Sequence, residues 1–310
     1  MMEQNQPRAA SMPDPAPLIM VAGIAALDTI YPITTALVAG QKHRCPQVQT
    51  VLGGNAANAA RAIARLGGRT ELVARLGDDD VAAQVRAELD REGVGHALSP
   101  PLPGCQTSRS AILIEPDGAR TIANMFDPAF PDLPDWLPRL LLPRTRAVLG
   151  DIRWEAASLR LLELARRAGL PGVLDGDRAP RDARLIDAAS HVVFSMQGLA
   201  ELTGIAEPQG ALAAFARAQT TGDDRFLAVT DGPNGVFARI DGQILHIPAP
   251  EVVAVDTLGA GDVWHGAFAL ALAEGQDLAA ALLFANIAAA LKCSRAGGGA
   301  GAPWRSELPG

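Results

Sequence analysis

Strand-like and helix-like segments alternate along most of this 310-residue chain. The apolar run LIMVAGIAAL (18–27) precedes the helical pattern NAANAARAIARLG (55–67), and RAVLGDI (146–152) precedes SLRLLELARRAG (158–169). Repeated strand–helix units of this kind favour a mostly parallel sheet flanked by helices. We therefore predict an α/β fold with three layers, in which the sheet lies between helices.

Two stretches, residues 29–52 and 105–126, break this alternation. They contain short extended runs such as TSRSAILIEPDGARTIANM (107–125), which has turn residues at PDG. We expect these stretches to form a small β-sheet laid over the α/β body. One domain would then span residues 17–303, between a disordered Pro-rich tail (1–16) and a C-terminal tail (304–310).

Composition excludes several classes of protein. The net charge is −7 and no basic stripe offsets it, so a nucleic-acid partner is not expected. The apolar runs are too short to span a bilayer, and 17–27 has the pattern of a buried strand instead of an export signal. The three cysteines and five histidines show no metal-ligand spacing, so no transition-metal site is expected. We expect a cytoplasmic enzyme.

The segment VDTLGAGDVWHG (255–266) places three small residues directly before a helical pattern. VVAVD (252–256) resembles a strand, TLGAG (257–261) a turn, and DVWHGAFALALA (262–273) a helix. The N–H groups of a first helical turn lack internal partners, and the helix dipole adds positive charge there. A glycine-rich turn lets an anion approach them, so this segment predicts a phosphate site.

Asp262 lies beside this predicted phosphate site. A carboxylate is a poor phosphate ligand, but it can accept the proton of a hydroxyl that attacks phosphorus. The alternative is that Asp262 is only an acid that favours a helix N-terminus. A second motif, GGNAAN (53–58), opens another helix with two glycines and offers neutral amides to a polyhydroxylated ligand, although it also fits a capped turn.

Together with GIAALD, RLGDD, REGV, LTG and TDGPNG, these two motifs resemble those of the PfkB (ribokinase-like) family of sugar kinases. The resemblance extends from about Leu18 to Pro303. It implies a ribokinase-like α/β/α fold with a β-sheet lid, ATP and Mg²⁺ as cosubstrate and cofactor, and a homodimer formed through the lid. Neither a P-loop nor a Rossmann fingerprint is present.

The resemblance also implies roles for individual residues. Asp262 would be the general base, and the backbone of Gly259, Ala260 and Gly261 would form the anion hole for the γ-phosphoryl group. Asp256 would sit beside a monovalent cation such as K⁺. The remaining positions would bind the sugar hydroxyls (Asp28, Gly54 and Asn55) or line the nucleotide (Thr230, Gly232, Gly235 and Asn286).

One departure from the family concerns magnesium. The family's N-x-x-E motif reads SMQG here, with Ser195 and Gly198 at its two ends. Mg²⁺ would then be held mainly by ATP phosphates and water, or by another acid. Asp175 and Asp177 in LDGD are two candidates that the sequence does not separate.

GDIRWE, LDGD, FSMQGLAELTG and AALKCSRAGGGAGAP are similar to segments of the sulfofructose kinases within this family. The similarity implies transfer of the γ-phosphoryl group of ATP to the C1 hydroxyl of 6-deoxy-6-sulfofructose. Arg153, Asn124 and Lys42 would bind the sulfonate, and a shift of one residue in the lid would put His43 in place of Lys42. The alternatives are a kinase for fructose or a phosphorylated ketohexose, and a catalytically silent sugar sensor.

Overall fold

The computed structural model of the protein describes residues 16–219 and 225–309. The predicted N-terminal tail lies outside this part of the chain except for Ala16, which is exposed.

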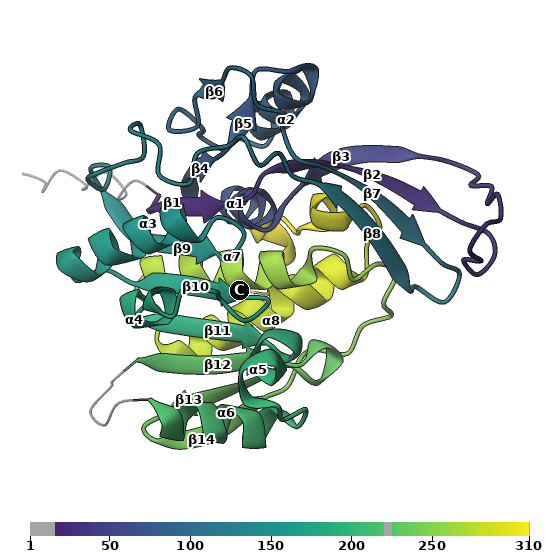
Figure 1. Cartoon of the computed structure of the whole chain (residues 1–310). Helices are drawn as coiled ribbons and strands as arrows, with labels where there is room; N and C mark the ends of the chain where they lie inside the picture. The colour runs from purple at the N-terminus through teal and green to yellow at the C-terminus, as the bar shows by residue number, and fades with distance from the viewer. Residues whose placement is uncertain (1–15, 220–224, 310) are drawn as a thin grey trace, which may run out of the picture.

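The body of the protein is an eight-stranded sheet with the order β14-β13-β12-β11-β10-β9-β1-β4 (Figure 1). Its six strands from β12 to β4 run parallel, and β13 and β14 add an antiparallel edge. The strands of this sheet are β1 (Leu18–Gly23), β4 (Arg69–Ala74), β9 (Thr145–Asp151), β10 (Gly172–Gly176), β11 (His191–Ser195), β12 (Phe226–Thr230), β13 (Val236–Ile240) and β14 (Gln243–Ile247).

Helices cover both faces of this sheet, which is why its central strands are buried along almost their whole length. One hydrophobic cluster joins the sheet to α1 (Asn55–Arg65), α2 (Asp80–Arg91), α7 (Ala260–Ala273) and α8 (Leu278–Cys293). A second cluster on the other face includes α3 (Glu155–Ala168), α4 (Arg184–Ala188), α5 (Met196–Thr203) and α6 (Pro208–Ala218). The predicted three layers are therefore present.

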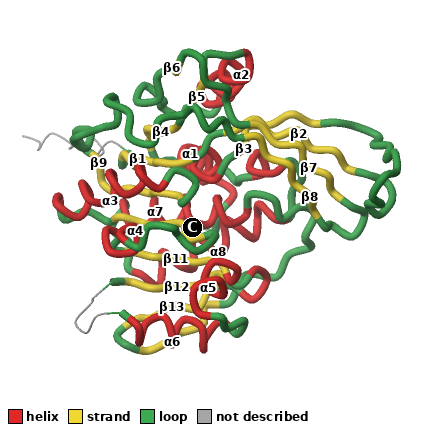
Figure 2. The backbone as a smooth tube through the Cα atoms, in the orientation of Figure 1, coloured by secondary structure: helices red, strands yellow, loops and turns green. Residues whose placement is uncertain are grey.

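The lid is a separate four-stranded sheet of order β3-β2-β7-β8 that projects to one side of the body (Figures 1 and 2). Its strands are β2 (Ala26–Pro32), β3 (Gln49–Gly53), β7 (Arg109–Ile114) and β8 (Arg120–Met125). Residues 105–108 precede the lid, close to the short pair β5 (Leu76–Gly77) and β6 (Pro101–Leu102).

The run LIMVAGIAAL was predicted as one strand, and this prediction was wrong. The chain leaves the main sheet after Gly23, because the Ile24 N–H donates to the Asp151 carboxylate at 2.9 Å instead of to a neighbouring strand. β2 then begins at Ala26 in the lid. Asp28 accordingly lies within the first lid strand and not at the end of the first strand of the body.

The prediction of a strand at VVAVD was also wrong. The segment is irregular, and Val253 and Val255 are exposed. The N–H groups of Val255 and Asp256 both donate to the Cys293 carbonyl, so they do not form a ladder with another strand. The segment instead fastens the turn before α7 to the end of α8.

The C-terminal residues pack against the body. Gly298–Gly301 and Arg305–Glu307 form short 3-10 helices, and a third, Gly232–Asn234, follows β12. Arg305 pairs with Glu274 at 3.0 Å and lies 4.8 Å from the Phe284 ring.

Among the described residues, no helix is both long and apolar enough to cross a membrane.

Candidate active site

Two helix N-termini meet at the carboxyl ends of β9 and β10. α1 begins after Gly54, α7 begins after Gly259, and both first turns lie against the same strand ends (Figure 1). Gly54 has φ +93°, and a Cβ there would stand 2.5 Å from the Ile24 carbonyl oxygen. Only glycine permits this close approach at the start of α1.

The turn before α7 has the geometry expected of an anion site. Gly259 adopts the left-handed conformation, with φ 79° and ψ 6°, and a Cβ at Gly261 would meet open space. The Ala260 N–H donates to the Thr257 carbonyl at 3.2 Å, so this amide is already engaged within the turn. The amides that follow it in the first turn are the ones best suited to a phosphoryl group.

Asp262 lies in that first turn and is partly buried. Asn58, on the first turns of α1, donates from Nδ2 to Asp262 Oδ2 at 2.8 Å. Burial raises the pKa of Asp262 to about 7, the charge of Asp175 adds to this effect, and the Asn58 hydrogen bond opposes it. A carboxylate with a pKa near neutrality is well matched to proton transfer at physiological pH.

Asp175, near the end of β10, lies close enough to Asp262 for its charge to raise the pKa of that residue. Asn55 Nδ2 is 3.5 Å from one of its carboxylate oxygens, and the buried His265 Nε2 is 3.5 Å from the other. His265 Nδ1 also lies 2.7 Å from the Gly261 carbonyl, which joins Asp175 to the turn before α7. Burial and the neighbouring charges of Asp177 and Asp151 raise the pKa of Asp175 well above its usual value.

Asp151 organises the opposite side of the site. Its carboxylate accepts hydrogen bonds from the backbone N–H groups of Ile24 (2.9 Å), Ala56 (3.1 Å) and Arg153 (2.8 Å). One buried side chain therefore fixes the exit from β1, the start of α1 and the loop that carries Arg153. Burial raises the pKa of Asp151 to about 6, and the hydrogen bonds oppose that rise.

The lid presents polar side chains in one cross-strand row. Asp28, Ser110 and Asn124 occupy matched positions on β2, β7 and β8. Asn124 Nδ2 lies 3.1 Å from Ser110 Oγ. A Cβ at Gly53 would stand 1.9 Å from an Asp28 oxygen, so glycine makes room for this carboxylate. Burial raises the pKa of Asp28, and a hydrogen bond with Ser110 opposes the rise.

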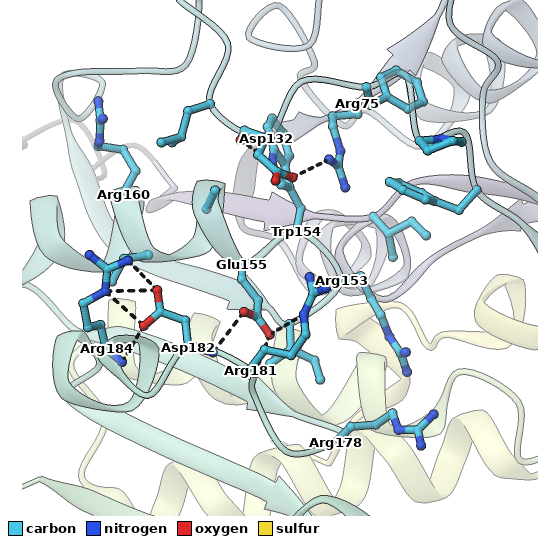
Figure 3. Close-up of a pocket in the computed structure, with 18 of the residues that line it drawn as sticks. Arg75, Asp132, Arg153, Trp154, Glu155, Arg160, Arg178, Arg181, Asp182 and Arg184 are labelled. Carbon is cyan, nitrogen blue, oxygen red and sulfur yellow. Dashed lines mark hydrogen bonds and ion pairs between the residues drawn. The ribbon is translucent and has the colours of Figure 1, made fainter.

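A cavity of about 920 Å³ lies between the lid and the start of α3, and six arginines line it together with the acids Asp132, Glu155, Glu163 and Asp182 (Figure 3). Asn124 and Arg153 line it, whereas Asp262, Asp28 and Lys42 do not. The Arg153 guanidinium is ion-paired with Asp177. Lys42 is exposed in the β2–β3 loop, where His43 is hydrogen-bonded to Val38, so no contact joins either residue to Arg153. The cavity's cationic side chains are Arg75, Arg153, Arg160, Arg178, Arg181 and Arg184.

Arg75 was not singled out from the sequence. It is 9% exposed, and its guanidinium lies 4.8 Å from the Phe126 ring and 4.9 Å from the Trp154 ring. Its carboxylate partner, Asp132, is 3.4 Å away and largely exposed. Arg75 and Arg153 both line a smaller cavity that Gly23 and Ile24 also border. Contacts with aromatic rings therefore hold this guanidinium in place.

Three of the four predicted nucleotide residues lie at or just after the end of β12, and the fourth, Asn286, does not. Thr230 ends β12, and Gly232 and Gly235 follow it with φ values of 51° and 97°. Asn286 is buried on α8, where it accepts from Trp264 Nε1 at 2.8 Å and donates to the Ile247 and Pro248 carbonyls. Its side chain is therefore committed to internal bonds that hold α8 against the end of β14.

The residues near β10 fit a magnesium ion carried by phosphates. Buried oxygens of Asp175 and Asp177 have no hydrogen-bond partner. Mg²⁺ is commonly held by one or two carboxylates together with phosphate oxygens and water. No cluster of three or more His, Cys, Asp or Glu in the described residues could hold a metal by itself. Ser195, which begins the SMQG segment that replaces the family's N-x-x-E motif, caps α5 by accepting from the Gly198 N–H at 3.0 Å.

Three of these site residues, Asp151, His265 and Arg75, were missed from the sequence. Asp151 carries a detectable signal, since it is a carboxylate at the end of an apolar strand-like run. His265 follows Asp262 by one helical turn, which places both on one face of α7. Arg75 carries no comparable signal, because its aromatic neighbours come from distant parts of the chain.

Comparisons with known proteins show the family to which the chain belongs. The family described as pfkB family carbohydrate kinase matches residues 16–305. A ribokinase of Bacillus subtilis is 29% identical, covering 94% of this chain and 97% of its own. A fructokinase of Klebsiella pneumoniae is 30% identical, covering 87% and 92%.

Solved structures share the fold. One from Agrobacterium tumefaciens has a TM-score of 0.85 and 35% identity, covering 94% of this chain and 96% of that one. An Arabidopsis thaliana ribokinase complexed with ribose and ATP has a TM-score of 0.79 and 26% identity, covering 94% and 97%. The fold is thus ribokinase-like, as predicted, and the chain belongs to the pfkB family of carbohydrate kinases.

Proposed function

We propose that this ATP-dependent sugar kinase phosphorylates the C1 hydroxyl of 6-deoxy-6-sulfofructose, giving 6-deoxy-6-sulfofructose 1-phosphate and ADP. The observation that carries the choice of sugar is the arginine-lined cavity beside the lid. A neutral sugar needs no such surroundings, whereas a sulfonate gains charge-assisted hydrogen bonds from them.

The chemistry follows from the positions of the two helix N-termini. Asp28, Gly54 and Asn55 would hold the sugar hydroxyls, with the acceptor hydroxyl directed at Asp262. The Asp262 carboxylate takes the proton as the oxygen attacks the γ-phosphorus and the bond to ADP breaks. Amides in the first turn of α7, next to Gly259, bind the charge on the phosphoryl oxygens.

ATP would lie along the strand ends that carry Thr230, Gly232 and Gly235. Mg²⁺, when bound to the ATP phosphates, would neutralise part of their charge, and Asp175 and Asp177 are the carboxylates placed to assist. Because four acids gather here (Asp151, Asp175, Asp177 and Asp262), a cation is needed before a polyphosphate can approach. Because the reaction consumes ATP, we expect it to take place in the cytoplasm.

The anionic end of the sugar would enter the cavity between Arg75 and Arg153. Both line the large cavity beside the lid, and Asn124 reaches the same cavity from β8. Arg153 is ion-paired with Asp177, so a sulfonate would share or replace that partner. Lys42 and His43 would join this contact only after movement of the β2–β3 loop.

We predict that sulfofructose has the highest kcat/KM among sulfofructose, fructose and fructose 6-phosphate in an ADP-release assay. Arg153→Ala should lower kcat/KM for sulfofructose about ten- to hundred-fold more than for fructose, because one charge-assisted hydrogen bond contributes roughly 1.5–3 kcal/mol. Arg184→Ala is the matched control, since Arg184 lines the same cavity but is 73% exposed and paired with Asp182.

Equal kcat/KM for fructose and sulfofructose would rule out the sulfonate assignment. A preference for fructose 6-phosphate would reassign the arginines to a phosphate, since both anions are tetrahedral. If Arg153→Ala lowers kcat/KM equally for every sugar, the role of Arg153 is structural and it does not recognise the sulfonate.

The pKa of Asp262 sets a second prediction. A protonated Asp262 cannot accept a proton, so kcat/KM should fall tenfold per pH unit below about pH 7 and level off above it. Asn58→Ala removes the hydrogen bond that lowers this pKa and should move the acidic limb to higher pH. Asn234→Ala, which removes an exposed amide, should leave the limb in place.

Asp262→Asn should lower kcat by roughly 10²- to 10⁴-fold, the usual contribution of a general base. The same measurement addresses the alternative that the protein is a silent sugar sensor. If wild type and Asp262→Asn release ADP at the same background rate with every sugar, the sensor is the better description.

We further propose that the protein is a homodimer formed through the lid. Apolar side chains are exposed there, including Val48 at 50% and Ile122 at 52%. Ile122 shares a cross-strand row with the buried Ile30 and Ile112, so it continues their apolar row onto the edge strand of the lid. An apolar lid face that projects beyond the body is suited to a second copy of itself.

Ile122→Glu should convert the dimer into a monomer, which sedimentation velocity measures directly. Thr121→Glu introduces the same charge on the opposite face of β8 and should leave the dimer intact. A monomeric wild-type protein, or a dimer unaffected by Ile122→Glu, would exclude this interface.

A further inference from the structure

The Asp256 carboxylate ties together the two backbone segments beneath the anion site. Oδ1 accepts from the Leu258 N–H at 2.8 Å, directly before Gly259, and Oδ2 accepts from the Gly298 N–H at 2.8 Å. The side chain is 11% exposed. The shape of the turn before α7 therefore depends on what neutralises this carboxylate.

Lys292 supplies the neutralising charge. It lies in the last turn of α8 with a fully buried side chain. Its Nζ donates to the Asp256 carbonyl oxygen at 2.6 Å and is 3.5 Å from Asp256 Oδ2. Burial lowers the pKa of Lys292, and the Asp256 carboxylate opposes that shift. An ammonium buried this deeply is tolerated only where such partners are provided.

Lysine is rare in this protein, so its use at position 292 in place of arginine is informative. The only other lysine in the sequence is Lys42, and the remaining basic residues are arginines apart from the histidines. An arginine has a planar, forked head group, whereas an ammonium is a compact point charge with three donors. Of the basic side chains, lysine comes nearest to a bound monovalent ion in size and charge.

The residues beside Asp256 do not fit a potassium ion. K⁺ is held by several oxygen atoms, and the carbonyl and Oδ2 oxygens of Asp256 already face the Lys292 ammonium. A second positive charge within a few Å would be repelled by the first. The expectation of a monovalent cation at Asp256 therefore disagrees with the structure.

We infer that the Lys292 ammonium takes the place of a monovalent cation beside Asp256, and that phosphoryl transfer by this enzyme is independent of K⁺. Lys292 is a positioning residue. It acts through Asp256 on the turn 257–261, and hence on the amides that bind the phosphoryl group. The inference rests on the kinase activity but not on which sugar is phosphorylated.

The experiment compares turnover in the chlorides of potassium, sodium and choline at equal ionic strength, with whichever sugar is phosphorylated. Wild-type rates should agree within about twofold. Lys292→Ala should lose about tenfold or more in choline chloride, because it leaves Asp256 without its buried partner. K⁺ or ammonium should restore much of the lost activity by entering the space that the Lys292 side chain leaves. Lys292→Met fills that space, so K⁺ or ammonium should not restore its activity. Arg217→Ala removes an exposed positive charge and serves as the control.

The thermal unfolding midpoint provides a readout that needs no turnover. K⁺ should raise the midpoint of Lys292→Ala relative to choline, and should leave the wild type unchanged, because only a cation bound to the folded state stabilises it. Wild-type activity that rises tenfold or more in K⁺ overturns the inference, even if the variants do not fold. Full activity of Lys292→Ala in choline also overturns it. Failure to phosphorylate sulfofructose, with turnover of another sugar, would affect only the choice of substrate.

Discussion

The hydrogen bond between Asn58 and Asp262 joins the two helix N-termini on which the rest of the site depends. It connects the first turns of α1 and α7, whose motifs lie about 200 residues apart in the chain. Each helix begins at a glycine with positive φ, so backbone amides and a carboxylate are exposed at the same strand ends. In the mechanism that we propose, the phosphoryl group and the acceptor hydroxyl meet at these strand ends.

This arrangement concentrates negative charge, and the surroundings show how the protein tolerates it. Burial and mutual repulsion raise the pKa values of Asp151, Asp175 and Asp262. Asp151 is stabilised by four backbone amides, Asp256 by a buried lysine, and Asp177 by Arg153. Each acid thus has a different kind of partner. Asp151 and Asp256 hold backbone segments in place, and the raised pKa of Asp262 suits its carboxylate to the proton transfer that we propose for it.

Sequence reasoning succeeded where the relevant residues are contiguous. GGNAAN and DTLGAGD each combine a turn, a helix start and a polar side chain, and the structure has α1 and α7 beginning at these motifs, with Asn58 and Asp262 in contact. It failed where tertiary contacts determine the local structure. VVAVD has the β-branched residues of a strand but does not pair with another strand. The first apolar run is divided by the Ile24–Asp151 hydrogen bond. Arg75 and Lys292 could not be assigned, because their partners come from segments far away in the chain.

The most direct test of this account is a crystal structure with a non-hydrolysable ATP analogue and the sugar bound. The account predicts that a carboxylate oxygen of Asp262 lies about 3 Å from the acceptor hydroxyl, within hydrogen-bonding reach. It also predicts that the terminal phosphate contacts amides in the first turn of α7. An acceptor hydroxyl that faces another carboxylate, with Asp262 still bonded only to Asn58, would contradict it.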